Sequence, residues 1–299
     1  FRCTQRSCKL PRRSMLNRVF KAFTALSCLS LISMLTARPA IAEEPVELAP
    51  QTPWNVEWAE NHCTLQRVFG PVDSPFSLRL NLYAPADNYE VLMVGKQLRP
   101  LHPAIATTLV LDTGMRPPMR ISRWQNPVSD NQEPAILLTL ERENTQAKRP
   151  QAVAVGAEFG RTTRLRLESD GKVIVLNTGP MAQVLNALDT CSIDLVAEWG
   201  LDPEIQKSLS RHVKIKGIDP LNYPLNSMRK GSEARVSMHM LIDAEGKPTK
   251  CEIAQSYSTK LFEQEVCAKM LGTRFEPALD ANGIPVASYF ATTISFVLP

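Results

Sequence analysis

Short runs in which apolar and polar residues alternate dominate residues 54–176, and this is the pattern of half-buried β-strands. The runs predict strands over 54–58, 65–69, 77–83, 90–94, 107–111 and 135–140. Two further runs, 162–167 and 172–176, flank Asp170-Gly171, and these two residues favour a two-residue hairpin turn. This part of the chain is therefore predicted to be rich in β-structure.

A helical pattern follows these strands. Apolar residues recur at helical spacing at Met181, Val184, Leu185, Leu188, Leu195, Val196 and Trp199. We expect Thr178 to cap this helix, Pro180 to begin it and Gly200 to end it. Asp202-Pro203-Glu204 predicts the start of a second short helix. The first domain is thus expected to be a β-rich sheet packed by C-terminal helices.

The last eighty residues show both the alternation typical of β-strands and the spacing typical of a helix. Strict alternation over 234–243 predicts a half-buried strand, and Asp243 to Gly246 predicts the turn that follows it. The returning strand places Cys251 and Ile253 on its inner face. A helix is expected over 261–271, with an apolar stripe made by Leu261, Phe262, Val266 and Met270. With the final strand this gives a three-stranded antiparallel sheet and two helices, so the fold class is α+β.

The N-terminal segment has the composition of a secretory signal peptide. Met15 is the expected initiator, and residues 1–14 lie upstream of it. Arg18 and Lys21 precede an apolar run over 22–37, and Ala40-Ile41-Ala42 offers a cleavage site. Because 16 apolar residues are short for a membrane span of about 20, cleavage after Ala42 and a periplasmic location are predicted. An uncleaved inner-membrane anchor is the alternative.

Removal of this segment changes the charge of the chain. Eight of the 34 Lys and Arg residues, and none of the 30 acidic ones, lie in residues 1–42. The remaining chain has 26 basic residues, hence a net charge of −4, and gives no support for nucleic-acid binding.

Four of the seven cysteines lie after residue 42, and an even number in an exported protein favours disulfides. Four cysteines allow three pairings, and buried free thiols are the alternative. We predict Cys63–Cys191 and Cys251–Cys267, one bridge in each of two domains over 43–211 and 225–299, joined by a linker over 212–224. The shorter bridge would stabilise its domain by roughly 3 kcal/mol. Neither metal spacing nor a cofactor motif is recognised, so no metal and no cofactor are expected.

Residues 223–298 resemble the C-terminal domain of TonB-family energy transducers. The resemblance rests on the order of Tyr223-Pro224, the strand hairpin around Asp243–Gly246, Arg274-Phe275-Glu276-Pro277-Ala278 and Gly283-Ile284-Pro285-Val286. In that family the last strand pairs with a short segment of an outer-membrane transporter. The chain differs from the family in its predicted cleavable signal and in having a folded domain in place of a long proline-rich spacer.

The resemblance implies a periplasmic interaction protein that serves transmembrane transport, is not an enzyme, and contacts the membrane only through its partners. The partner would be an outer-membrane transporter or another envelope protein, bound by strand addition. The implied pairing strand runs from Tyr289 to Val297, with Tyr223 and Pro224 as flanking contacts. Its predicted binding residues are Tyr289, Ala291, Thr293, Ser295 and Val297. A second hypothesis is an envelope structural module that uses the same edge for self-pairing into a homodimer.

Asp112-Thr113-Gly114 suggests a third hypothesis, a secreted aspartic protease. That chemistry needs two carboxylates that share a proton, so one copy of the motif would require a dimer. The second element of such a site would be Val153-Ala154-Val155-Gly156. The four histidines, His62, His102, His212 and His239, show no triad or metal spacing and are expected in surface or capping roles.

Overall fold

The computed structural model describes residues 44–86, 88–99, 107–114, 118–121, 133–141, 152–154, 157–217, 221–258 and 260–298. The predicted signal peptide lies outside these residues. Within them, no helix is both long enough and apolar enough to cross a membrane.

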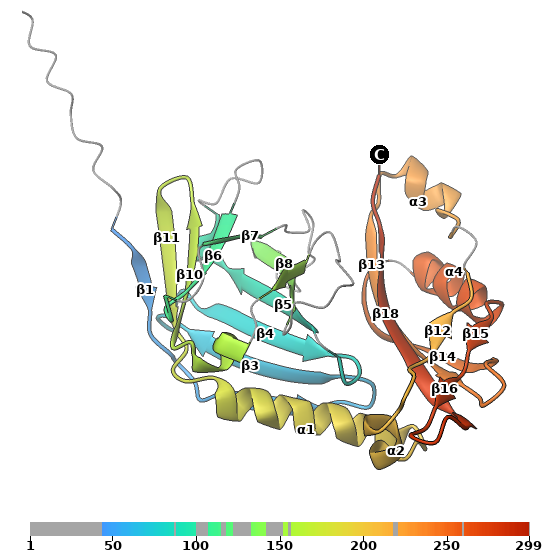
Figure 1. The fold of residues 1–299 in the computed structure, drawn as a ribbon. Helices are drawn as coiled ribbons and strands as arrows, with labels where there is room; N and C mark the ends of the chain where they lie inside the picture. The colour runs from blue at the N-terminus through green and yellow to red at the C-terminus, as the bar shows by residue number, and fades with distance from the viewer. Residues whose placement is uncertain are drawn as a thin grey trace, which may run out of the picture. The chain divides into compact units, whose positions relative to one another are not determined.

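Two sheets build the N-terminal part of the described chain (Figure 1). The first has the order β1 (Val46–Leu48), β11 (Lys172–Asn177), β10 (Arg164–Ser169), β6 (Thr107–Leu111) and β7 (Met119–Ile121). The second has the order β2 (Asn55–Trp58), β3 (Cys63–Phe69), β4 (Phe76–Leu82), β5 (Asn88–Gly95), β8 (Ala135–Glu141) and β9 (Ala152–Ala154). Each predicted strand of this part is present. The 3₁₀ helices η1 (Lys96–Leu98) and η2 (Ala157–Arg161) complete it.

The hairpin between β10 and β11 forms at the predicted turn. Asp170 and Gly171 have φ angles of 51° and 75°. Positive φ at both central residues is the requirement of a type I′ turn, whose twist matches that of paired strands. Asp is among the few non-glycine residues that adopt this conformation, because its short polar side chain can form local hydrogen bonds.

Helix α1 (Ala182–Glu198) and the short helix α2 (Pro203–Lys207) follow the sheets. The predicted cap of α1 is wrong, because its N-cap is Met181 and the hydroxyl of Thr178 donates to the Gly179 carbonyl oxygen instead. The predicted cap of α2 forms, since Asp202 Oδ1 accepts from the amide of Glu204 at 2.9 Å.

One apolar cluster lies between the two N-terminal sheets and α1. Alternate residues of β3, β4, β5 and β8 point into it, and α1 adds Leu185, Leu188 and Leu195. Cys63 on β3 is joined to Cys191 on α1, with 6.0 Å between their Cα atoms, so the helix is covalently fixed to the sheet. This is the predicted first pairing.

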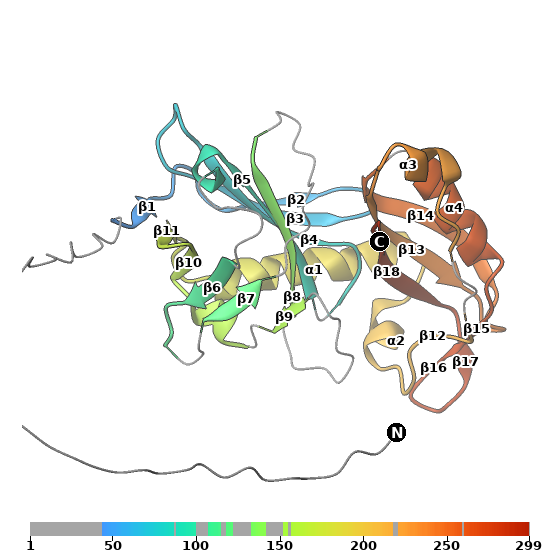
Figure 2. The same cartoon turned by 90° about the horizontal axis from the view of Figure 1, so that it is seen from above.

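The C-terminal sheet has the order β14 (Pro248–Tyr257), β13 (Ala234–Ile242) and β18 (Ser288–Phe296), with all neighbours antiparallel. Helix α3 (Leu225–Arg229) precedes it, and α4 (Lys260–Leu271) packs on one face (Figure 2). Phe262, Val266 and Met270 of α4 are buried as predicted, but Leu261 is 47% exposed. The predicted Cys251–Cys267 bridge joins β14 to α4.

Short strands connect the predicted linker to this domain. β12 (Lys214–Ile215) pairs with β15 (Phe275–Glu276), and β16 (Ala278–Leu279) pairs with β17 (Pro285–Val286). Val213 and Ile215 belong to the second apolar cluster, which α4 and the C-terminal sheet form. Much of the segment predicted as a linker therefore packs against the C-terminal sheet; the boundaries themselves stay a prediction.

Gly246, in the turn after β13, is expected to be intolerant of any side chain. Its φ is +81°, and an added Cβ would lie 2.3 Å from the Phe275 carbonyl oxygen. Gly283 is a matched control, since its φ is +79° and nothing lies within 4 Å of the position that an added Cβ would take. We expect Gly283→Ala to lower the free energy of unfolding by about 1 kcal/mol and Gly246→Ala by about 3 kcal/mol. Urea unfolding measures both, and equal losses would contradict the steric argument.

Candidate functional site

The strongest candidate for a binding surface is the second edge of β18. This strand pairs with β13 through nine consecutive residues, Ser288 to Phe296. In the described part of the chain no strand pairs with its other edge. The strand ends one residue before the predicted limit, and Val297 lies beyond it with 52% exposure.

The two faces of β18 have different roles. Phe290, Ile294 and Phe296 pack on the second apolar cluster, under the helix α4. The predicted binding residues Tyr289, Ala291, Thr293 and Ser295 alternate with them and so lie on the opposite face. The Thr293 hydroxyl is 2.9 Å from that of Ser237 on β13. Of this set only Ser295 is exposed, and the other three are half-buried.

Tyr223 and Pro224 lie near the C-terminal end of β18. The Tyr223 ring makes edge contacts with Phe262 and Phe296, at centroid distances of 5.5 and 5.7 Å. Its hydroxyl donates to the Ser232 carbonyl oxygen at 2.6 Å, and Pro224 is the N-cap of α3. The ring is thus used for packing, and its contact with a partner stays a prediction.

The polar face of the C-terminal sheet is covered, contrary to the expectation of a half-buried strand. Ser237 and His239 on β13 are each 1% exposed. The covering surface is the second face of the sheet that holds β5 and β8, together with Trp199 after α1. Both faces of β13 are therefore buried. The covering face is not purely polar, because Leu92 of β5 and Leu137 of β8 form a third apolar cluster with Tyr257 of β14.

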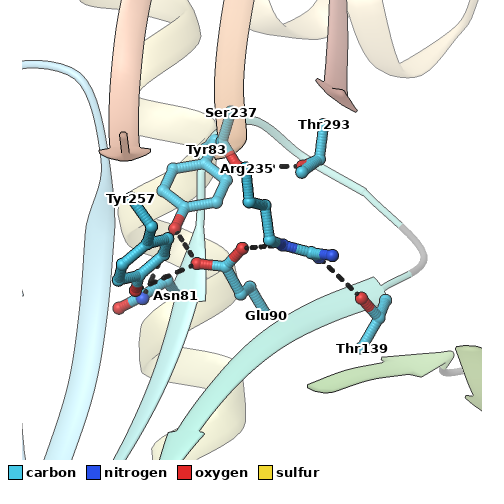
Figure 3. A network of polar contacts seen from close by, with 8 residues as sticks. All are labelled: Asn81, Tyr83, Glu90, Thr139, Arg235, Ser237, Tyr257 and Thr293. Carbon is cyan, nitrogen blue, oxygen red and sulfur yellow. Dashed lines mark hydrogen bonds and ion pairs between the residues drawn. The ribbon is translucent and has the colours of Figure 1, made fainter. Parts of the chain in front are cut away.

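Glu90 of β5 is the centre of the contact between these two faces (Figure 3). Its Oε2 accepts from Arg235 Nε at 2.9 Å, and the side chains of Arg235 and Glu90 are 11% and 4% exposed. Its Oε1 accepts from the hydroxyls of Tyr83 and Tyr257, the latter at 3.4 Å. Arg235 also donates to the Thr139 hydroxyl at 2.9 Å. A buried charge pair with these added hydrogen bonds is well compensated.

The two tyrosines of this network stay protonated at physiological pH. Burial raises the pKa of Tyr83 well above its ordinary value, and the negative charge of Glu90 raises it further. Burial and the same carboxylate also raise the pKa of Tyr257. Both hydroxyls therefore act as permanent donors to Glu90.

His239 is the largest departure from the sequence prediction, which placed it at the surface or in a cap. Its ring stacks on Trp199, which follows α1, with 4.0 Å between ring centroids and 17° between planes. Its Nε2 lies 3.0 Å from a carboxylate oxygen of Glu252. Burial lowers the pKa of His239 more than the carboxylate raises it, so the ring is neutral at physiological pH. His102 lies outside the described residues.

Asp112 has a structural partner. Its Oδ1 accepts from the Thr163 amide at 2.9 Å, and its Oδ2 accepts from the Thr163 hydroxyl. Burial raises the pKa of Asp112, but these hydrogen bonds outweigh it and hold the pKa below the ordinary value. These two contacts join the residue that follows β6 to the residue that precedes β10, which is a structural role for Asp112, and the protease stays a hypothesis. Of the suggested second element, Val155 and Gly156 lie outside the described residues.

Comparison with known proteins identifies the C-terminal domain. Residues 219–298 match the family of the Gram-negative bacterial TonB protein C-terminal domain. The solution NMR structure of the Pseudomonas aeruginosa TonB C-terminal domain is similar at 27% sequence identity over 30% of this chain and 89% of that one, with a TM-score of 0.26. No curated protein matches the chain. The predicted resemblance is confirmed for this segment, and the chain carries a TonB-family C-terminal domain.

Proposed function

We propose that this chain is a periplasmic interaction protein of TonB-dependent transport. Its β18 edge binds an extended segment of an outer-membrane transporter, or of another envelope protein, by strand addition. The observation that carries the proposal is the nine-residue strand β18, which is paired on one side only in the described part of the chain. An unpaired edge offers a row of backbone donors and acceptors to a second chain.

The TonB-family match over 219–298 supports this kind of partner. Backbone hydrogen bonds supply affinity in strand addition, whatever the partner's sequence. The proposal needs neither a cofactor nor a catalytic group. It places the chain in the cell envelope, in agreement with the two disulfides.

Two neighbouring proline substitutions test this mode of binding. Adjacent residues of a strand direct their amides to opposite edges, so Ala291→Pro and Thr292→Pro remove donors on different sides of β18. We expect one variant to lose stability, because it breaks the ladder with β13. The other stays folded and loses roughly tenfold or more in affinity, because it loses an outward donor and its ring obstructs the incoming strand.

Synthetic peptides that cover the periplasmic N-terminal segments of the host's outer-membrane transporters serve as probes, with fluorescence anisotropy as the readout. Circular dichroism and urea unfolding identify the folded variant. Unchanged affinity in that variant contradicts strand addition at β18. Sedimentation tests self-pairing. If the wild-type chain is a dimer and the folded proline variant is a monomer, the homodimer hypothesis is favoured over transporter binding.

A further inference from the structure

Two cavities lie beside β18 on its polar face, where the N-terminal part of the chain forms the opposite wall. The wall segment follows β4 and includes Pro85 and Ala86. It is tied to β18 by a hydrogen bond from the Tyr289 hydroxyl to the Pro85 carbonyl oxygen, at 3.2 Å. Ala86 lines both cavities, and β18 contributes residues to each.

The larger cavity, called here the Tyr289 cavity, has a volume of about 370 Å³. Ile193 and Val196 of α1 and Pro203 of α2 give it apolar walls, while Asp189, Lys207 and His212 supply polar groups. This volume and lining suit one large apolar side chain, which would gain free energy by leaving water.

The smaller cavity, called here the Glu90 cavity, has a volume of about 50 Å³. Ala291 and Thr293 line it from β18, and Glu90, Thr139 and Arg235 line it from the network of Figure 3. The charges of Glu90 and Arg235 already neutralise each other, with 2.9 Å between Glu90 Oε2 and Arg235 Nε. A charged guest therefore has no unpaired partner in Glu90 or Arg235, and the volume admits only a small side chain.

The spacing of the two cavities is that of a β-strand. On β18, Tyr289 lines one cavity, and Ala291 and Thr293, two and four positions further on, line the other. A step of two residues along a strand covers about 6.6–6.8 Å. A strand added to the free edge has the same repeat, so successive side chains on its polar face meet the two cavities in turn.

We infer that the N-terminal part selects the peptide that β18 binds. The preferred occupant is an extended segment with a large apolar residue at the Tyr289 cavity and a small uncharged residue two or four positions away at the Glu90 cavity. This inference rests on the proposed strand addition. It adds that the specificity is set by residues outside the TonB-family domain, namely Pro85, Ala86, Ile193, Val196 and Pro203.

Selection from a displayed library of random nonapeptides on the full mature chain tests the inference. We expect the enriched peptides to share one large apolar residue with a small residue two or four positions away. Exchange of the large residue for alanine is expected to weaken binding to the wild type roughly tenfold or more. In Ile193→Phe, whose larger ring narrows the cavity, the same exchange is expected to weaken binding less than it does in the wild type. Ile205→Phe is the matched control, because Ile205 is 38% exposed on α2 and outside the cavity lining.

The outcomes separate this inference from the proposed function. The inference is overturned if the enriched peptides need the β18 edge but share no pair of a large apolar and a small residue, and if Ile193→Phe has no effect on their affinity. Strand addition would still stand in that case. If no peptide is enriched and the proline variants change nothing, both fail. A tenfold discrimination in the wild type that is reduced in Ile193→Phe but not in Ile205→Phe, with urea unfolding unchanged, supports the inference.

Discussion

Replacement of Cys63 and Cys191 by alanine is expected to lower the free energy of unfolding by about 5 kcal/mol. The bridge closes a loop with a sequence separation of 128, and the chain-entropy account assigns about this free energy to a loop of that size. Both cysteines are fully buried, so the lost sulfur contacts add to the effect. Urea unfolding under oxidising conditions, followed by far-ultraviolet circular dichroism, measures the loss.

The second bridge provides the matched comparison. Cys251 and Cys267 are separated by 16 positions, for which the same account gives about 3 kcal/mol. Replacement of that pair by alanine is therefore expected to cost about 2 kcal/mol less than replacement of the first pair. An equal or larger loss for the shorter loop contradicts the entropic ranking and points to the packing of β14 on α4 as the dominant contribution.

Much of the fold follows from short-range patterns. The hairpin of β10 and β11 is predictable because Asp170-Gly171 supplies two residues that accept positive φ. The sheet of β13, β14 and β18 is predictable because its apolar residues alternate and its turn has Gly246 at φ +81°. Local sequence determines such elements, so no knowledge of distant contacts is needed.

The polar face of the C-terminal sheet was not predictable in the same way. Its cover comes from residues far away in the chain: Arg235 meets Glu90 across 145 positions, and His239 meets Trp199 across 40. The relevant signal was in β5 and β8, whose near-continuous apolar runs Val91–Val94 and Ile136–Leu138 are typical of strands buried on both faces. Those runs indicate a cover on the second face of the sheet but not its identity.

Replacement of Glu90 by alanine is expected to lower the free energy of unfolding by about 3–5 kcal/mol. The change leaves the Arg235 guanidinium, 11% exposed, without its carboxylate, and an unpaired buried charge is strongly destabilising. It also removes the acceptor of the Tyr83 and Tyr257 hydroxyls. The loss is measured by urea unfolding. Glu204→Ala is the control, because the Glu204–Lys207 pair is exposed and should contribute less than about 1 kcal/mol.

A double-mutant cycle distinguishes the ion pair from packing. In Glu90→Leu with Arg235→Met, apolar side chains replace both charges, and most of the stability is expected to return. A double variant as unstable as Glu90→Ala shows that the hydroxyl network of Tyr83 and Tyr257 carries the stabilisation instead. A Glu90→Ala variant within about 0.5 kcal/mol of the wild type contradicts the buried contact itself. In that case the polar face of the TonB-family sheet is open in solution, and the wall that the N-terminal part provides beside β18 is lost with it.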